Sequence, residues 1–537
     1  MSTNINIDTI WVFALFSKCN HFSTFNLFIS LFVIAIVWLT VALLHWSYPG
    51  GPAWGKHRLA RMFHWAKKPI PGPRGLPIIG SMSLMTGLAH RKISDMAKTC
   101  NAKRLMAFSL GETRVIVTCH HDVAKDILHS SNFADRPIKE SAYSLMFNRA
   151  IGFAPYGVYW RTLRRVASTH MFSPKQIKAS ESQRYVIASA MTGYFGTQTG
   201  PFQPRDVLRR ASLSNMMGSV FGQKCSLVEG PENNNKESEE LREMVGEGYD
   251  LLGMLNWGDH LSWLSDFDFQ KIRFRCSQLV PKVNRFVGRI ITEHRANPVP
   301  NSPDFVDVLL NLPSSDKLSD SDMISVLWEM IFRGTDTVAV LIEWILARVV
   351  LHPDVQSRVH DELDNVVGRS RAVSESDITS LVYLTAVIKE VLRVHPPGPL
   401  LSWARLAIGD TTVDGHHVPA GTTAMVDMWA ITRDPEIWAE PDTFNPDRFL
   451  GSGAASEISI LGSDLRLAPF GSGRRACPGK ALGLATVSFW VASLMHEYEW
   501  VSSAADATVD LSEVLKLSCE MAHPLTVEVR RRRASVM

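Results

Sequence analysis

Residues 470–479 read Phe-Gly-Ser-Gly-Arg-Arg-Ala-Cys-Pro-Gly, and this short stretch decides the fold. It sets a single cysteine, Cys477, between Arg475 and Gly479. Gly473 and Gly479 can adopt positive φ angles, so the loop can turn tightly and direct its amides toward the sulfur. A thiolate presented in this way suits a haem iron, because it pushes electron density onto the metal and hydrogen bonds to the sulfur tune its potential.

The pattern Phe-x-x-Gly-x-Arg-x-Cys-x-Gly resembles the haem-binding loop of cytochrome P450 enzymes at every fixed position. An isolated cysteine is usually an inert buried residue, but these matches together favour a metal ligand. The resemblance implies that Cys477 binds the iron of haem b, that Arg475 pairs with a haem propionate and that Phe470 shields the sulfur from water. It also implies haem contacts from elsewhere in the chain: Trp160 and Arg164, in a Trp-x-x-x-Arg pattern, and Arg405.

A long apolar helix is predicted over Asp322–Leu351, because Pro353 follows its end and Ser319 or Ser321 can cap its start. The sequence Arg-Gly-Thr-Asp-Thr at 333–337 forms a polar island inside this helix. Since the helix is apolar almost all round, it is expected to be buried. A polar island in a buried helix is a candidate site for oxygen chemistry.

The resemblance implies catalytic roles for Thr337, which hydrogen-bonds oxygen, and for Asp336, which supplies protons through water. The alternative is structural: a buried helical threonine often bonds the carbonyl four residues earlier, and the acid can pair with Arg333. The commoner family pattern Ala-Gly-x-Asp-Thr-Thr is broken at Arg333 and Val338, but the threonine assigned to oxygen is retained. Monooxygenation is therefore still expected.

Glu390 and Arg393 lie three residues apart, on one face of a predicted helix. They resemble the Glu-x-x-Arg pair of the same family, in which a third arginine completes a network. Arg448, in the sequence Phe-Asn-Pro-Asp-Arg-Phe at 444–449, is the expected third member. We interpret this triad as structural support beneath the haem.

The composition excludes several classes of function. With a net charge of +3 and 20% charged residues, the chain has no electrostatic signature of a nucleic-acid-binding protein. Its seven cysteines are dispersed without a C-x-x-C pair, which argues against a disulfide framework or a zinc site. A hydrophobic content of 46% allows a large core, and no linker or internal repeat divides the chain after Pro71.

An uncharged apolar run, Leu27–Leu44, is long enough to span the hydrocarbon core of a bilayer. Trp46 and Tyr48 follow as interfacial aromatic residues, and the positive-inside rule places the downstream side in the cytosol. A cleaved signal peptide is the alternative, but its apolar region would be shorter and followed by a small-residue cleavage site. We therefore expect a single-pass anchor in the endoplasmic reticulum membrane, with a cytosolic catalytic domain. Basic residues follow the run, against Lys18 alone before it: Lys56, Arg58, Arg61, Lys67 and Lys68.

Three segments are expected. Residues 1–48 form a lumenal segment and membrane anchor, residues 49–75 a basic linker with a proline hinge, and residues 76–537 the haem-thiolate catalytic domain. The hinge prolines fix φ and favour an extended strut. The resemblance implies a mainly α fold with small β-sheets, the cytochrome P450 fold, preceded by a transmembrane helix.

Family position suggests four stretches for the substrate pocket, and their apolar composition favours a hydrophobic substrate. They are Ser141–Phe153, Ile331 with Phe332, Leu400–Trp403 and Met521–Pro524. A fifth segment, Leu251–Phe269, contains Trp257, Trp263, Phe267 and Phe269. Packing in the core is the default interpretation of these aromatic residues, and a roof that dips into the membrane is the alternative.

In detail the chain resembles plant microsomal A-type enzymes of cytochrome P450 family 78, subfamily A. The residues behind this are Gly50–Gly55, Phe332–Ala339 and Ser402–Arg405. The resemblance implies insertion of one oxygen atom from O2 into a fatty acid or similar molecule, and a role in organ and seed growth.

Electrons would come from NADPH through NADPH–cytochrome P450 reductase, because the chain has no G-x-G-x-x-G site of its own. Arg474, Arg475 and Lys480 are basic residues that can dock an acidic reductase. Two other functions stay open. One is a haem-thiolate isomerase or dehydratase that needs no reductase, and the other is a non-catalytic membrane protein that binds haem or lipid.

Overall fold

The computed structural model describes residues 24–60, 68–222, 236–297, 304–401, 404–451, 455–503 and 509–532. Several residues named above lie outside the described ranges: Lys18, Arg61, Lys67, Ser402 and Trp403.

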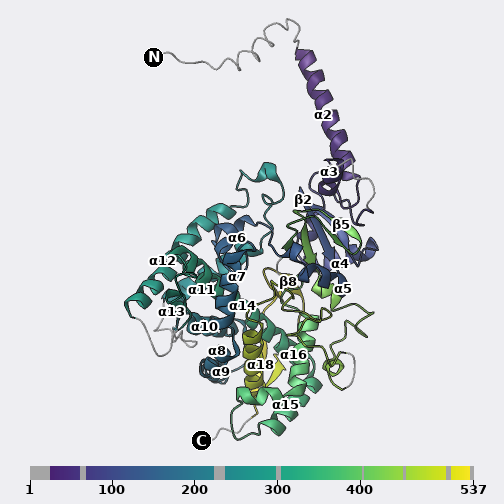
Figure 1. Cartoon of the computed structure of the whole chain (residues 1–537). Helices are drawn as coiled ribbons and strands as arrows, with labels where there is room; N and C mark the ends of the chain where they lie inside the picture. The colour runs from purple at the N-terminus through teal and green to yellow at the C-terminus, as the bar shows by residue number, and fades with distance from the viewer. Residues whose placement is uncertain are drawn as a thin grey trace.

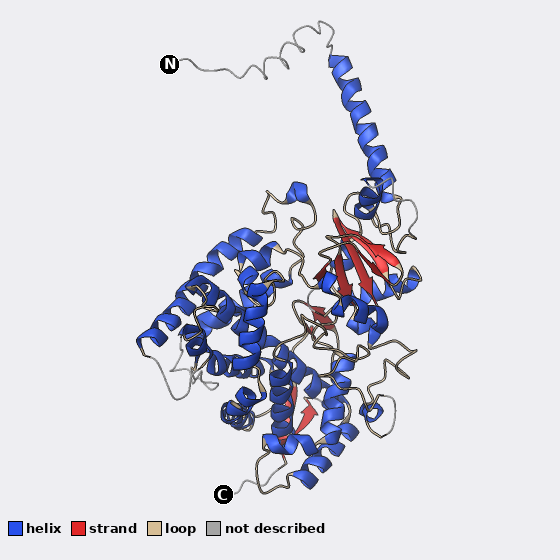
Figure 2. Cartoon of the chain, viewed as in Figure 1, coloured by secondary structure: helices blue, strands red, loops and turns tan. Residues whose placement is uncertain are grey.

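Helices are the predominant secondary structure of the described residues, and the sheets are small (Figure 2). This confirms the predicted mainly helical class. The longest helix, α14 (Asp320–Leu351), packs against α10, α12, α16 and α18 and runs through the core. The other helices are α2 (Thr24–Trp46), α3 (Pro52–Ala60), α4 (Ala89–Thr99), α5 (His121–His129), α6 (Glu140–Ser144), α7 (Val158–His170), α8 (Pro174–Ala179), α9 (Glu181–Phe195), α10 (Arg205–Phe221), α11 (Lys236–Gly253), α12 (Ile272–Ala296), α13 (Phe305–Leu310), α15 (Pro353–Val366), α16 (Val382–Val394), α17 (Met428–Ile431) and α18 (Lys480–Glu497).

The main sheet has four strands in the order β1-β2-β6-β3, with β2 and β6 parallel and the other pairs antiparallel. Three antiparallel pairs, β10-β7, β4-β5 and β8-β9, complete the strands of the described residues. The strands are β1 (Met106–Leu110), β2 (Thr113–Thr118), β3 (Arg405–Leu406), β4 (Thr411–Val413), β5 (His416–Val418), β6 (Thr423–Val426), β7 (Tyr498–Ser502), β8 (Glu513–Leu515), β9 (Cys519–Met521) and β10 (Val527–Arg531).

The start of α14 is fixed by its N-cap. Ser319 accepts a hydrogen bond from the backbone N–H of Asp322 at 3.1 Å, so the first of the two expected caps is the one used. The helix begins two residues earlier than predicted, at Asp320, and ends at Leu351, as predicted. Met330, Arg333, Gly334, Thr337, Val338 and Leu341 recur at helical spacing and face one cavity, whereas the opposite faces are packed in the core.

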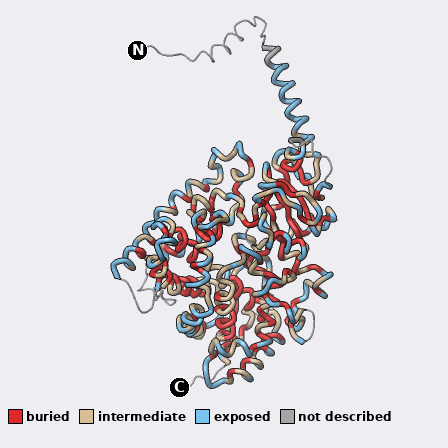
Figure 3. The backbone as a smooth tube through the Cα atoms, in the orientation of Figure 1, coloured by how far each residue is buried: buried red, intermediate tan, exposed pale blue. Residues whose placement is uncertain are grey.

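The helix α2 projects from the body next to the main sheet, and its side chains from Phe28 onward are mostly exposed (Figures 1 and 3). By length and composition, Phe28–Trp46 is the one helix among the described residues that can cross a membrane. It is tied to the body at its end, because Trp46 Nε1 donates a hydrogen bond to the Gly75 carbonyl at 2.8 Å.

Part of the expected linker is folded. The helix α3 lies within residues 49–75 and packs against β1. Trp54 is 6% exposed, and its Nε1 donates to the Phe108 carbonyl at 3.0 Å. Gly55 allows α3 to approach the end of α2, since a Cβ there would lie 2.0 Å from the His45 carbonyl oxygen. The apolar helix therefore meets the body through a packed contact.

Candidate functional site

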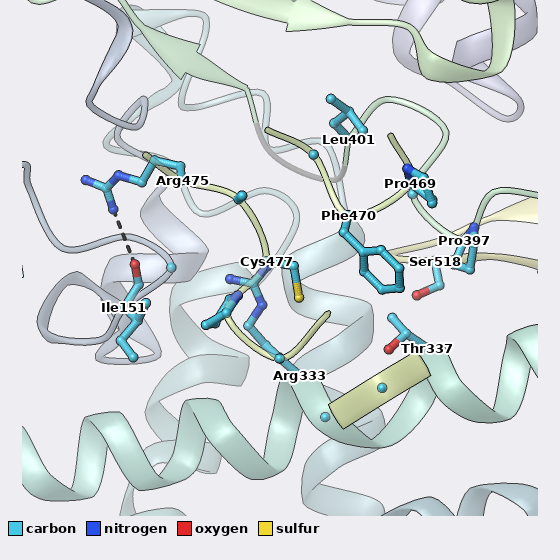
Figure 4. Close-up of a pocket in the computed structure, with 18 of the residues that line it drawn as sticks. Ile151, Arg333, Thr337, Pro397, Leu401, Pro469, Phe470, Arg475, Cys477 and Ser518 are labelled. Atoms are coloured by element: carbon cyan, nitrogen blue, oxygen red, sulfur yellow. Dashed lines mark hydrogen bonds between the residues drawn. The ribbon is translucent and has the colours of Figure 1, made fainter. Parts of the chain in front are cut away.

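A cavity of about 280 Å³ separates α14 from the loop that carries Cys477. In Figure 4 the sulfur of Cys477 points toward α14, which carries Arg333 and Thr337 on the side that faces it. Phe470, Arg475, Gly479, Trp160, Arg164 and Arg405, all expected from the sequence at one site, also line this cavity. The structure therefore brings together residues that are as much as about three hundred positions apart in the chain.

The loop around Cys477 is built by glycines that only partly match the expectation. Gly473 has a φ of +69°, and a Cβ on it would lie 2.0 Å from the Leu128 carbonyl oxygen at the end of α5. Gly479 was also expected to use a positive φ, and this is wrong: its φ is −87°, because it is the N-cap of α18. The Cys477 N–H donates to the Phe470 carbonyl at 2.9 Å, which closes the loop.

The thiol of Cys477 is deep in the protein but faces the open cavity, so its side chain counts as exposed. Burial raises the pKa of this thiol above its usual value, whereas the charge of Arg333 and the Gly479 amide act in the opposite direction. A metal cation at the sulfur reverses this balance, since a coordinating thiol is deprotonated outright. The start of α18 beside it adds the positive end of a helix dipole.

Besides Arg333 on α14, four arginines line this cavity: Arg136, Arg164, Arg405 and Arg475. Burial, followed by the charges of Arg475 and Arg164, lowers the pKa of Arg405 to about 9. One terminal nitrogen of Arg405, Nη1, is buried and has no hydrogen-bond partner among the described residues. Crowded cations with an unsatisfied donor suit a ligand that carries two carboxylates, and haem b has two propionates. The residues present thus fit the group.

Arg475 is held by backbone carbonyls. Its guanidinium donates to the carbonyls of Ala134 at 2.9 Å and Ala154 at 2.7 Å. It also donates to the Ile151 carbonyl at 3.3 Å (Figure 4). Burial lowers its pKa to about 10. Its guanidinium carbon also lies 4.3 Å from the ring centre of Trp160. Arg475 therefore anchors the loop to the preceding segment in addition to lining the cavity.

The two expected catalytic residues on α14 have different surroundings. Thr337 lines the cavity, but Asp336 is not among the lining residues. Instead, Arg209 on α10 donates from Nε to Asp336 Oδ1 at 2.9 Å. Burial raises the pKa of Asp336, against the opposing charge of Arg209. The pairing of the acid with Arg333, one of the structural alternatives, is not what the structure shows.

Arg333 pairs with Glu329 one helical turn before it, at 3.4 Å between Nη1 and Oε1. The carboxylate of Glu329 also accepts the Gly152 N–H at 2.8 Å, and burial raises its pKa. A Cβ on Gly152 would lie 2.2 Å from both side chains, so only glycine leaves room for this pair. The Gly152 carbonyl in turn accepts a bond from Arg136 at 3.2 Å. This ionic cluster joins α14 to the segment around Ile151 and Gly152, which lines the cavity.

The three members of the expected triad lie together. Arg393 Nη2 and Glu390 Oε1 are 2.8 Å apart, and both side chains are 0% exposed. Arg448 Nε donates to the same carboxylate oxygen at 3.1 Å. Arg393 also donates to the carbonyls of Thr432 and Pro441. The network ties α16 to the segment that follows α17 and does not line the cavity.

The expected substrate stretches match the cavity only in part. Ile151, Gly152 and Leu401 line it, but Ile331, Phe332 and Met521–Pro524 do not. Phe332 turns away because it follows the cavity-facing Met330 on the helix, and it packs 4.5 Å from the ring of Tyr249. The default interpretation placed the aromatic residues of Leu251–Phe269 in the core, and this is wrong. They are exposed: Trp257 by 48%, Trp263 by 59%, Phe267 by 60% and Phe269 by 66%.

Sequence reasoning missed three charged residues of the site: Arg136, Arg209 and Glu329. Each takes part through a partner far away in the chain, such as Gly152 for Glu329, 177 residues apart. The only local signal was a lone acid on the cavity face of α14, one turn before Arg333. Such a position does not name its partner.

Known proteins resemble this chain over almost its whole length. The family described as "Cytochrome P450" matches residues 70–518. The chain is 64% identical to "Cytochrome P450 78A9" of Arabidopsis thaliana over 99% of both chains. It is also 64% identical to "Cytochrome P450 78A3" of Glycine max, over 99% of this chain and 100% of that protein. To "Flavonoid 3'-monooxygenase" of Arabidopsis thaliana it is 34% identical, over 86% of this chain and 92% of that protein.

These matches confirm the resemblance to subfamily 78A that the motifs indicated. A thiol that faces α14 across a cavity edged with arginines, together with these relatives, assigns the chain: it belongs to the cytochrome P450 family of haem-thiolate monooxygenases.

Proposed function

We propose that Cys477 would hold the iron of haem b, and that Arg136, Arg164 and Arg405 would hold its propionates. The observation that carries this proposal is the position of the Cys477 sulfur, which faces Thr337 across a cavity with an unsatisfied arginine donor at its edge. When bound, haem supplies the site at which O2 is activated for insertion of one oxygen atom into a C–H bond. Phe470 beside the sulfur excludes water.

The supply of protons to the cavity is assigned to Thr337 and Asp336. The Thr337 hydroxyl is open to the cavity, whereas Asp336 lies behind it in a chain of charges. Arg209 joins Asp336 to Glu520, at 2.5 Å between Nη2 and Oε2, and Glu520 is bound at 2.8 Å by the half-exposed Lys516. Arg209 stays charged and holds Asp336 in place, and the Asp336 side chain keeps 13% of its surface exposed. The acid can therefore take up a proton from solvent and pass it to Thr337 through water.

The substrate is proposed to be a fatty acid or a similar hydrophobic molecule. The cavity walls away from the arginines are apolar, with Met330, Val338, Leu341 and Leu401. Apolar walls with a few polar groups favour a hydrophobic guest whose orientation those groups fix. By resemblance to subfamily 78A, the product would act in plant organ growth.

Electrons are proposed to come from NADPH through the reductase of the endoplasmic reticulum. The apolar helix Phe28–Trp46 supports a single-pass anchor there, with the body in the cytosol. The exposed side chains of Trp257, Trp263 and Phe267 support a second, shallower contact with the bilayer. Lys480 and Arg474 each donate to a backbone carbonyl, of Leu461 at 2.6 Å and of His129 at 3.0 Å. Arg474 is exposed and Lys480 only partly so, which makes Arg474 the better candidate for docking an acidic reductase.

The test is product analysis by mass spectrometry. The full chain, with reductase, NADPH and fatty acids of graded length, is expected to give hydroxylated products. Cys477→Ala should abolish both the product and the thiolate-type absorption band of the reduced carbon-monoxide complex. Cys276→Ala, which removes another buried thiol, is the control and should retain both.

Product formation without NADPH would instead support the isomerase or dehydratase. The retained Asp336 and Thr337 disfavour that function, since it needs no proton supply for oxygen. Rescue of a growth defect by Cys477→Ala would support the non-catalytic alternative. A thiolate-type band without any product from fatty acids would keep the haem site and discard this substrate class.

A further inference from the structure

A second cavity, of about 350 Å³, lies where the apolar helix α2 meets the body. It is bounded by α3, by residues 68–70 and by the β4-β5 hairpin. None of the roles above uses it. Its lining residues are Tyr48, Trp54, His57, Arg58, Lys68, Pro69, Ile70, Asp410, Thr411, Thr412, His417 and Pro419.

The position of this cavity is fixed relative to the end of α2. Tyr48 follows the last residue of the apolar helix, Trp46, by two positions. Trp46 is bonded to Gly75, and α3 packs closely on the end of α2. In Figure 1 α3 lies at the base of α2, beside the sheet that carries the β5 label. With α2 across a bilayer, the cavity lies at the depth of the lipid headgroups.

Basic side chains dominate the lining. Arg58 and Lys68 are exposed, and His57 and His417 add two imidazoles. Arg58 is oriented by Tyr48: its Nη1 donates to the Tyr48 hydroxyl at 2.9 Å, and its guanidinium carbon lies 4.8 Å from the ring centre. A guanidinium held in this way still has donors for two oxygens of one anion.

The one acid of the cavity is engaged within the protein. Asp410 Oδ1 accepts the Ala420 N–H at 2.8 Å, and Oδ2 lies 3.7 Å from His417 Nε2. Thr411 and Thr412 supply hydroxyl groups at the rim. Two cations and two hydroxyl groups, beside an acid that already accepts the Ala420 N–H, suit a phosphate group.

We propose that this cavity binds the phosphate-bearing headgroup of an anionic phospholipid from the cytosolic leaflet. The inference rests on the membrane anchoring proposed above. A lipid is the source of the phosphate because the cavity opens beside the apolar helix, where lipid headgroups are concentrated and the cytosolic leaflet is negative. Bound there, the lipid bridges α3 and the β4-β5 hairpin and holds the body against the bilayer.

The experiment uses the full chain in nanodiscs of phosphatidylcholine with a minority of phosphatidylserine or phosphatidylinositol. Native mass spectrometry counts the lipids that stay bound after release. The parent is expected to retain anionic lipid above its share of the bilayer, and Arg58→Gln or Lys68→Gln to lose about fivefold of that enrichment. Lys56→Gln is the matched control, since it removes the same charge. Lys56 lies on the same helix as Arg58 but pairs with Glu112 outside the cavity.

Equal losses for Lys56→Gln and Arg58→Gln would overturn the proposal, because diffuse attraction would then explain the enrichment. Displacement of the lipid by millimolar inorganic phosphate would overturn the lipid source and leave a site for free phosphate. No enrichment in the parent would overturn both. Flotation of the parent with vesicles of phosphatidylcholine alone, and its reduced carbon-monoxide band, test the anchor and the haem site separately, so a failure of either is told apart from a failure of the lipid site.

Discussion

Arg209 joins two carboxylates that belong to different elements. It reaches Asp336 on α14 and Glu520 on β9, and the Glu520 side chain is 3% exposed. The charge of Arg209 favours the charged form of Asp336, against the effect of burial. In the proposed proton supply Asp336 must both take up and release a proton. Its pKa therefore matters, and that pKa depends on the pair with Arg209. Arg209 is a positioning residue, since it touches the acid and not the cavity.

Arg209→Gln is expected to reduce the yield of product per NADPH consumed several-fold. Without the cation the pKa of Asp336 rises further, so the acid retains its proton to a higher pH. The pH at which product yield changes should therefore move upward. The measurement is the ratio of product to NADPH oxidised across the pH range of activity. Arg210→Gln, an exposed neighbour on α10, should leave both the ratio and the profile unchanged.

Glu390→Gln is expected to cost about 3–5 kcal/mol of the free energy of unfolding, because Arg393 and Arg448 would keep buried charges without their partner. The control is Glu239→Gln, which breaks a pair at the same three-residue spacing with Arg242 on the surface. Exposed pairs of this kind contribute about 0.5 kcal/mol. Denaturant midpoints of the two variants measure the difference, and similar values would remove the structural role of the triad.

At the scale of elements, the loop that carries Cys477 is seated on the end of α5. Gly473 lies against the Leu128 carbonyl, and Ser472 Oγ lies 2.7 Å from His129 Nε2. Arg474 donates to the His129 carbonyl at 3.0 Å. These contacts position the loop, and with it the Cys477 sulfur, relative to α14.

Two glycines of this loop distinguish the effect of a close backbone contact from the effect of a positive φ angle. Gly471 and Gly473 both have positive φ, but a Cβ on Gly471 would meet nothing within 4 Å. Gly471→Ala is expected to cost about 1 kcal/mol, the price of a left-handed angle alone. Gly473→Ala adds a collision with backbone and should displace the loop, with loss of the thiolate-type band. Matching spectra and matching midpoints for the two variants would contradict this account of the loop.

The predictable elements were those that the sequence encodes locally. The helix α14 followed from an apolar run, a serine cap and a proline, and the Cys477 loop from residues that are neighbours in the chain. The wrong assignments concern orientation and distance. Ile331 and Phe332 face the core because of the helical period. Asp336 pairs with Arg209, 127 residues away, and not with Arg333, its neighbour in the sequence and the partner in the structural alternative. Contacts of that range depend on how α10 packs on α14, which no local pattern states.

At the scale of the whole molecule, buried histidines make stability depend on pH. Burial lowers the pKa of His395 to about 4, helped by Arg348, whose Nε donates to His395 Nε2 at 3.0 Å. Its other nitrogen faces Glu513 at 3.2 Å, and its ring is stacked 3.8 Å from Trp344. The native state therefore holds His395 neutral at pH values where an unfolded chain would protonate it.

The free energy of unfolding should fall as the pH drops from 6.5 to 4, because the unfolded chain then binds a proton that the folded one does not. His395 alone accounts for about 3 kcal/mol at the lower end. In His395→Gln, which keeps a polar side chain but does not titrate, the slope of stability against pH should be smaller by about one proton. Denaturant titrations at several pH values measure both slopes, and identical slopes would contradict the assignment.

The contacts between α2 and the body fix the rotation of α2, the membrane anchor proposed above, relative to the body. Trp46 is bonded to Gly75, and Gly55 abuts His45, so the helix cannot turn independently of the catalytic body. Each residue of an α-helix advances the rotation by about 100°. One residue inserted before His45 would therefore leave both contacts intact but rotate the preceding part of α2 by about that angle relative to the body. The face of α2 that lies over a given side of the body thus depends on the spacing of its residues from His45 and Trp46, as well as on their hydrophobicity.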